Sequence, residues 1–238
     1  MDALTIAATS MLNDIDRVAT VGHNLTNLST PGYRRIVDTG EALRYAGLQS
    51  QATSLMLSVD ASASTVDMNA GAAKSTGNPT DLAIDGNGFF ELQSANGVLL
   101  TRRGDFQVDR EGRLSSSSGD PVLGQNGPIN FTSSSIRIEA DGRIFDGDKL
   151  VDQLRIVSVA NPASLVPQGN GTYVAAQTSV EDAKGYRIRQ GVLEGSNVAS
   201  ATEMVQLIEL VKHIESNQKV LQFEDELMGK ALDKFAEL

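Results

Sequence analysis

The last stretch of the chain, from Ser200 to Leu238, repeats apolar residues at alternating steps of three and four, the spacing of one face of an α-helix. Only Gln218 and Asp225 interrupt this stripe. Ser200 and Glu203 have the spacing of a capping box, which predicts that the helix begins there. A helix of this length extends roughly 50 Å. A chain of 238 residues cannot cover it with one ordinary domain, so a second element must lie along it.

A second stripe with the same spacing lies at the other end of the chain, where residues 3–28 are predicted to form a helix. Two interpretations fit: two amphipathic helices that pack on one core, or a terminal coiled-coil-like layer that assembles with other copies. We favour the second, because the stripes lie at both termini around a middle of different character. Gln218 and Asp225 would then fix the register or face a channel or a loop. The predicted assembly interface comprises Leu4, Met11, Ile15, Val18, Leu25, Met204, Leu207, Val211, Ile214, Leu221, Met228 and Leu232.

A turn is predicted directly after the first helix. Thr30 precedes Pro31, which disfavours helix, and Pro-Gly is a strong turn signal. The side chains of Asn24 and Asn27 can cap the last helical carbonyls or the turn, and Gly32 is expected to need a positive φ angle. We expect this turn to set the angle at which the chain leaves the helix. Gly32→Val should then impair assembly more than it lowers the melting temperature of the monomer.

The middle of the chain is predicted to form a mostly antiparallel β domain. From Asp81 onward, apolar residues alternate with a period of two, and turn sequences containing Gly separate the alternating segments. Residues 106–114 and 136–144 share one pattern, which predicts two similar hairpins. The fold class is therefore α+β. The predicted domains are a helical assembly domain of residues 1–33 and 199–238, an extended linker with some strand over residues 34–77, and the β domain over residues 78–192.

Composition excludes several classes of function. The net charge of −10 and the pI near 4.7 argue against nucleic acid and against anionic membrane surfaces as partners. No apolar run is long enough for a membrane-spanning helix, so no membrane insertion is expected. The chain has no Cys, which excludes disulfides and thiolate metal sites and suits a chain that leaves the cytoplasm without oxidative folding.

Motifs for chemistry are also missing from the sequence. Asp85 and Asn87 resemble the opening of a calcium-binding loop, but Phe89 and Phe90 occupy later ligand and turn positions, so a plain turn is favoured. The two histidines share no local zinc-ligand motif. We therefore expect neither an enzyme nor a cofactor. A secreted binding module, which would need an aromatic or charged patch, and an enzyme with a dispersed polar cleft are the open alternatives.

Three segments resemble the bacterial flagellar rod and hook proteins of the basal body, and they occur in the family's order across nearly the whole chain. The first segment is Asn24, Asn27, Thr30, Pro31, Gly32 and Tyr33. The second is residues 76–90, continued by Thr101, Arg102, Gly104, Phe106 and residues 109–114. The third is Leu193, Glu194, Ser196, Asn197 and Val198, followed by Glu203, Met204 and Val205. The chain departs from the usual family residues at His23, Thr26 and residues 212–214.

This resemblance implies a structural protein that stacks helically into a hollow axial tube. Both terminal helices would form the inner layer of the tube, and the β domain would face outward. The implied partners are other copies of the chain, neighbouring rod proteins and, during secretion, the flagellar type III export apparatus. The implied location is the periplasm-spanning rod of the basal body. The short length and the single β domain disfavour a hook-type axial subunit. A proximal rod protein is preferred, and a distal rod protein is the alternative, because the two differ little at these motifs.

Overall fold

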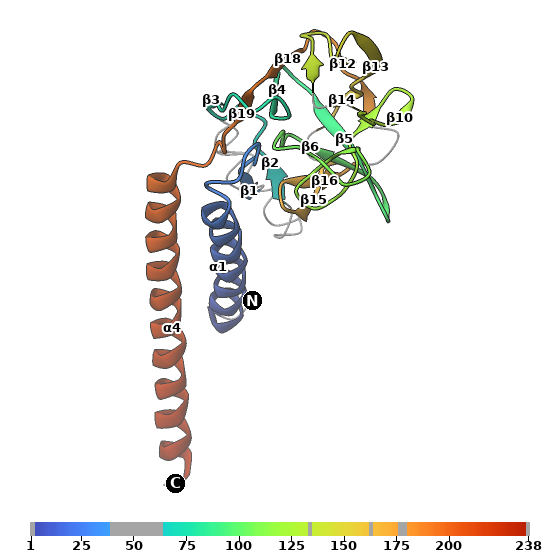
Figure 1. Ribbon diagram of the computed structural model, residues 1–238. Helices are drawn as coiled ribbons and strands as arrows, with labels where there is room; N and C mark the ends of the chain where they lie inside the picture. The colour runs from blue at the N-terminus through green and yellow to red at the C-terminus, as the bar shows by residue number, and fades with distance from the viewer. Residues whose placement is uncertain (1–2, 39–63, 133–134, 162–163, 176–179, 237–238) are drawn as a thin grey trace. The chain divides into compact units, whose positions relative to one another are not determined.

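The computed structural model describes residues 3–38, 64–132, 135–161, 164–175 and 180–236 (Figure 1). In this part of the chain a helix lies near each terminus and antiparallel strands lie between them, which confirms the predicted α+β class. The residues group into two compact units. The helix unit comprises residues 1–26, 36–64 and 199–238, and the β unit comprises residues 27–35 and 65–198.

The helix unit is built on α1 (Ala3–Thr26) and α4 (Ser200–Ala236), which lie side by side and run antiparallel (Figure 1). The helix α4 begins at the residue that the capping box predicts, and α1 ends two residues before its predicted end. With 37 residues against 24, α4 runs on past the N-terminal end of α1. Only the first part of α4 can therefore be covered by α1.

The faces that the two helices bury against each other are not the faces that apolar spacing predicts. The fully buried positions are Ala7, Asp14, Val21 and Asn24 on α1, and Glu203 and Leu210 on α4. Half-buried members of the predicted stripe lie beside them: Met11, Val18, Leu25, Leu207, Ile214 and Leu221. On each helix, the fully buried positions named above other than Asn24 lie one residue before positions of the predicted stripe. Several of these buried positions hold polar residues. A pattern based on apolar residues at helical spacing therefore selects the exposed apolar residues next to them.

The β unit consists of short strands. Its six-stranded sheet has the order β15-β16-β6-β5-β14-β17. These strands are β15 (Val166–Gly169), β16 (Thr172–Val174), β6 (Gly97–Thr101), β5 (Phe89–Ser94), β14 (Ile156–Val159) and β17 (Val180–Asp182). A three-stranded sheet contains β11 (Ile136–Ile138), β12 (Arg143–Asp146) and β13 (Lys149–Gln153). The strand pairs are β3 (Ala73–Ser75) with β19 (Val192–Glu194), β4 (Leu82–Asp85) with β18 (Arg187–Gln190), β7 (Gln107–Val108) with β8 (Leu114–Ser115), and β9 (Leu123–Gly124) with β10 (Gly127–Pro128). Two further strands are β2 (Ser64–Val66) and, in the helix unit, β1 (Ile36–Asp38).

The core of the β unit lies on both faces of the six-stranded sheet. Successive side chains of a strand point to opposite faces, so Phe90 belongs to one apolar cluster and Phe89 to the other. The ring of Phe90 packs edge-to-face on Phe106 at a centroid distance of 5.1 Å, and Phe89 packs on Tyr173 at 6.0 Å. The larger cluster also buries residues of the surrounding small sheets, including Ile144 of the three-stranded sheet. The small sheets are thereby joined to the large one.

The two predicted hairpins have the same local structure. In the first, the Asp109 N–H donates to the carbonyl of Arg113 at 2.9 Å. In the second, the Glu139 N–H donates to the carbonyl of Arg143 at 2.9 Å. Both turns contain a glycine at positive φ in the matching position. This confirms the internal repeat of the sequence.

The segments next to the helices pack with the β unit and do not form a linker of their own. Residues 27–35 and 65–77 belong to the β unit, where β3 pairs with β19 and aligns Lys74 with Leu193. These segments are held by hydrogen bonds of polar side chains, which have no sequence period. The rest of the predicted linker, residues 39–63, lies outside the described residues.

Candidate assembly site

Large apolar side chains are exposed along both helices. They are Leu12 and Ile15 on α1, and Met204, Val205, Ile208, Val211, Val220, Phe223 and Leu227 on α4. Single exposed apolar residues are ordinary, but contiguous ones mark interaction surfaces. Helical spacing makes two rows of the α4 residues. The Met204 row is Met204, Ile208 and Val211, and the Phe223 row is Val220, Phe223 and Leu227.

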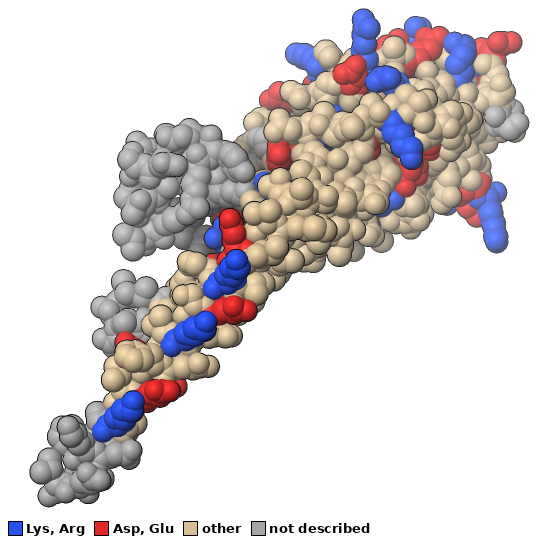
Figure 2. Space-filling view, turned by 90° about the vertical axis from the view of Figure 1, so that its left-hand side faces the viewer, with Lys and Arg blue, Asp and Glu red and all other residues tan. Residues whose placement is uncertain are grey.

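A row of charged side chains separates the two apolar rows. Figure 2 shows acidic and basic side chains alternating along the long helix, with uncharged surface beside them. The exposed charged residues at the matching spacing are Glu209, Lys212, Glu215, Lys219, Glu226 and Lys230. At 100° per residue, this row lies on the side of α4 away from α1. The helix therefore has a face toward α1, a charged face toward water, and an apolar row on each flank.

The predicted interface residues divide into two groups in the single chain. Ile15, Met204 and Val211 are exposed, whereas Met11, Val18, Leu25, Leu207, Ile214 and Leu221 are half-buried. The exposed residues are available to a neighbouring subunit, and the half-buried ones contribute to the contact between α1 and α4. The side chains of Leu4, Met228 and Leu232 lie outside the described residues.

The N-terminal signature residues form a closed turn. The Thr30 hydroxyl donates to Asn27 Oδ1 at 3.1 Å, and the Thr30 N–H donates to the Asn27 carbonyl at 3.1 Å. The Tyr33 N–H then donates to the carbonyl of Thr30 at 3.3 Å. The side-chain amide of Asn24 binds both backbone groups of Ile36, at 2.8 and 2.9 Å.

Gly32 has the positive φ angle that the sequence predicts, 64°. It is buried, and its N–H donates to the carbonyl of Glu194 at 2.7 Å. A Cβ at this position would lie 2.3 Å from the carbonyl carbon of Arg102. Gly32→Val is therefore expected to destabilise the isolated chain as well as to impair assembly, because residue 32 lies inside the β unit, against its backbone, and not in a loose terminus.

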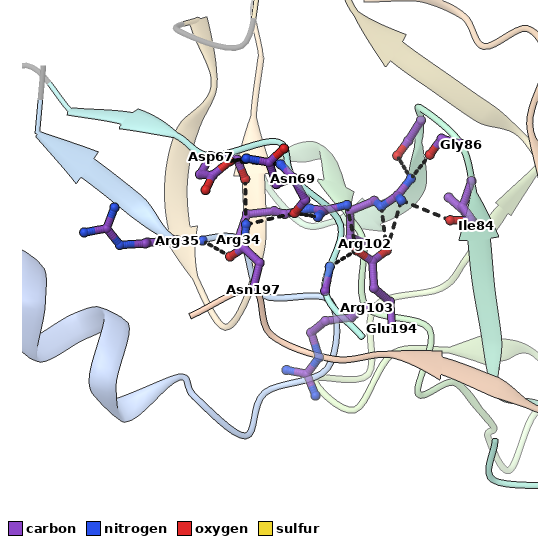
Figure 3. Close-up of polar contacts among 12 residues, drawn as sticks. Arg34, Arg35, Asp67, Asn69, Ile84, Gly86, Arg102, Arg103, Glu194 and Asn197 are labelled. Carbon is purple, nitrogen blue, oxygen red and sulfur yellow. Dashed lines mark hydrogen bonds and ion pairs between the residues drawn. The ribbon is translucent and has the colours of Figure 1, made fainter. Parts of the chain in front are cut away.

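Glu194, from the C-terminal signature, lies at the centre of a buried ion cluster (Figure 3). Its Oε1 accepts from Arg34 Nη2 at 2.7 Å and from the Gly71 N–H at 3.1 Å. Its Oε2 accepts from Arg102 Nη2 at 2.9 Å and from Nε at 3.1 Å. We call Arg34, Arg102 and Glu194 the Glu194 cluster. The three side chains are at most 6% exposed.

The excess positive charge of this cluster is bound by backbone carbonyls. Arg102 donates to the carbonyls of Ile84, Gly86 and Gly88 at 3.0, 3.0 and 2.6 Å, and Arg34 donates to the carbonyl of Asn69. A buried charge is tolerated only when it is paired and hydrogen-bonded. The cluster meets this condition at every charged group except the buried Nε of Arg34, which has no hydrogen-bond partner among the described residues. Its contacts join segments that are far apart in the sequence, so the cluster fixes how those segments meet.

Burial changes the acid–base behaviour of groups around the cluster. Burial raises the pKa of Tyr173 to about 12, and the Tyr173 hydroxyl accepts a hydrogen bond from the Arg34 N–H at 3.3 Å. Burial also lowers the pKa of Arg34, against the opposing effect of the Glu194 carboxylate. A guanidinium nonetheless stays protonated in proteins. Arg34 therefore keeps its positive charge near neutral pH.

The other residues of the C-terminal signature hold the N-terminal segment in place. Asn197 Oδ1 accepts from the Arg35 N–H at 2.6 Å, and its Nδ2 donates to the carbonyls of Asp67 and Asn69 at 3.0 and 2.9 Å. The Ser196 hydroxyl accepts from the N–H of the buried Val198 at 3.2 Å. Leu193 is half-buried on β19. The two signatures, far apart in sequence, are therefore one structural feature of the β unit.

The burial of polar residues between the helices was not predicted, although the sequence contains a signal for it. Glu203, Asn217 and Glu224 lie at heptad spacing, one residue before the predicted apolar positions, and all three are at least half-buried. Polar residues that recur at intervals of seven or fourteen would have indicated that the contact between the two helices is partly polar. Arg34 carries no such signal, because its partners come from loops.

The described residues contain no cluster of His, Asp and Glu that could hold a metal ion. No helix among them has the length and apolar character needed to cross a membrane.

Comparison with known proteins finds matches along most of the chain. The family described as flagellar hook protein FlgE/F/G D1 domain matches residues 83–145, and the family described as flagellar basal body rod FlgEFG protein C-terminal matches residues 189–234. The flagellar basal-body rod protein FlgF of Escherichia coli (strain K12) is 32% identical over 94% of this chain and 93% of its own length. FlgF of Salmonella typhimurium (strain LT2) is 33% identical over the same shares. The rod protein FlgG of Bacillus subtilis (strain 168) is 28% identical over 94% and 95%.

Proposed function

This chain belongs to the family of flagellar basal-body rod proteins, and we propose that it polymerises helically through the outer faces of α1 and α4. It is a structural subunit of the rod and is located in the flagellar basal body. Its partners in the assembly are other rod components, which we take to include further copies of the chain. Secretion through the flagellar export apparatus is part of the same proposal.

The exposed apolar rows carry the proposal of helical assembly. The Met204 row and the Phe223 row expose five large side chains and one methionine on the flanks of one helix, although α1 already covers part of that helix. A helix that is apolar on more than one side is usually covered on more than one side. Copies of the same chain, packed as a coiled-coil-like layer, would provide this cover.

Two adjacent substitutions on α4 test the proposal. Val211 belongs to the Met204 row, and Lys212 belongs to the charged row, yet both are exposed in the single chain. We expect Val211→Asp to abolish rod assembly and motility, because assembly would bury an unpaired carboxylate. Lys212→Asp should preserve both. The free energy of unfolding of either purified monomer should change by less than about 0.5 kcal/mol. Rods at the wild-type level in the Val211→Asp strain would contradict the proposal.

We also propose a proximal position in the rod. The short chain and its single β unit disfavour a hook-type subunit, and a distal position is the alternative, since relatives of both the FlgF and FlgG types match the chain. Electron microscopy of isolated basal bodies carrying a label on this chain would test the position. A label at the end of the rod nearest the hook would contradict it.

A further inference from the structure

We infer that three polar contacts set the register at which α1 and α4 pair within one chain. Asn24 Nδ2 donates to Glu203 Oε2 at 3.2 Å, His213 Nδ1 lies 2.9 Å from Asp14 Oδ2, and Asn217 Nδ2 donates to the Ser10 hydroxyl at 3.3 Å. In every contact the two residue numbers add to 227. The three contacts therefore belong to a single antiparallel register. We call them the register contacts.

The burial of these groups makes the contacts selective. Glu203 is 0% exposed, Asn24 is 1% exposed and Asp14 is 5% exposed. Asp14 also has Arg17 at 3.9 Å on its own helix, and Arg17 in turn pairs with Asp38 at 3.1 Å. A buried polar group that loses its partner costs more than an exposed one, because water cannot replace the partner. A register in which any of these buried groups loses its partner on the other helix is therefore disfavoured.

A slide by one heptad is the natural competitor, because it keeps the two stripes in contact. A slide in one direction places Asn24 opposite Leu210 and Asp14 opposite Val220. A slide in the other direction places Ser10 opposite Leu210 and moves Asn24 beyond the start of α4. Both slides leave buried polar groups facing apolar side chains or no helix at all. The apolar residues alone would not discriminate between these registers.

The register contacts also determine which surfaces are presented to other subunits. A slide by one heptad would move α4 along α1 by about 10 Å. The Met204 row of α4 would then shift by that distance relative to Leu12 and Ile15 of α1. This consequence for assembly depends on the proposed function, whereas the register itself does not.

Cysteine pairs can report the register in the full-length chain, because the chain has no cysteine of its own. In the observed register the position opposite Val21 is Gln206, directly next to Leu207. After a slide of one heptad it is His213, directly next to Ile214. A disulfide requires Cα atoms within about 7 Å, so a slide of about 10 Å separates the two outcomes. In the unmodified background, mild oxidation of the monomer should cross-link Val21→Cys with Leu207→Cys and leave Val21→Cys with Ile214→Cys largely uncross-linked.

Removal of two of the three register contacts should reduce the cross-linking between residues 21 and 207. In the Asp14→Leu/Asn24→Leu background, we expect the yield of the 21–207 disulfide to fall at least fivefold. The matched control is Asp16→Leu/Thr26→Leu, which replaces exposed polar residues of the same helix and should leave the yield unchanged. Equal yields of the 21–207 disulfide in the double variant and the control would overturn the inference.

A charge exchange distinguishes loss of register from loss of folding. Asp14→His alone opposes two imidazoles and should lower the yield of the 21–207 disulfide at least fivefold. Asp14→His combined with His213→Asp restores an acid opposite a histidine and should return the yield to within twofold of the original. Failure of the exchange to restore the disulfide would overturn the inference, even if the single variants lose it.

Discussion

The helix unit and the β unit place polar and apolar side chains in opposite ways. In the β unit most large apolar residues lie inside two clusters, although Val98, Val108, Leu150, Val166 and Val174 are exposed, and the charges of the Glu194 cluster are paired and bound by backbone carbonyls. In the helix unit polar residues such as Asp14 and Glu203 are buried, while apolar residues such as Ile208 and Phe223 are exposed. The β unit thus buries most of its large apolar side chains within one chain. The helix unit exposes many of its own, which is the property expected of a part that assembles.

Within the β unit, two ion clusters made of the same residue types differ in how far they are buried. Glu194 pairs with Arg34 and Arg102, and Glu139 pairs with Arg137 and Arg143. The side chain of Glu194 is 6% exposed, whereas that of Glu139 is 31% exposed. Water can solvate the partners of Glu139 but not those of Glu194. The same three residue types should therefore have different energetic effects.

The largest effect is expected from Gly32→Val. The substitution combines a β-branched residue at positive φ with a Cβ placed against the Arg102 backbone. We expect a loss of about 3–5 kcal/mol in the free energy of unfolding of the β unit, from backbone strain and overpacking. Urea unfolding of the purified monomer measures it. Gly77→Val is a matched control, because Gly77 also has positive φ but no atom within 4 Å of the added Cβ. Similar losses in both variants would mean that strain alone acts at residue 32.

A loss of unfolding free energy of similar size is expected from Glu194→Ala. Its removal leaves two buried guanidinium groups without their carboxylate, which should cost about 3–5 kcal/mol. Glu139→Ala, in the exposed cluster, should cost less than about 1 kcal/mol. Both values come from urea unfolding of the monomer near neutral pH. Equal costs for the two substitutions would refute the argument that burial distinguishes the clusters.

The smallest of the three effects is the ionisation of Tyr173. Its pKa is about 12 in the folded chain, against about 10 when unfolded. Both states are protonated below pH 10. The unfolded state then loses its proton first, so stability is lost as the pH rises from about 10 to 12, by roughly 2–3 kcal/mol. The difference in unfolding free energy between the wild type and Tyr173→Phe, measured across this range, should show the loss. A constant difference would contradict it.

Features that follow from residue spacing or from local turn chemistry could be predicted from the sequence. Features that depend on contacts formed only after folding could not. The two helices, the paired hairpins and the positive φ of Gly32 follow from spacing or local turn chemistry, and the structure agrees. The Glu194 cluster depends on loops that meet only after folding, so Arg34 could not be identified as a site residue. Met204 was placed on the stripe because it is apolar, whereas the adjacent Glu203 is the buried residue. Its partner, Asn24, lies 179 positions away in the sequence.

Amide hydrogen exchange on a verified monomer tests the difference between the units most directly. We predict the slowest exchange in β4, β5 and β6, intermediate protection from residue 203 to 217 of α4, and fast exchange from residue 226 to 236, which extend beyond α1 in the observed register. The gradient along α4 should disappear on assembly. Uniform strong protection of α4 in the monomer, or none from residue 203 to 217, would contradict the account.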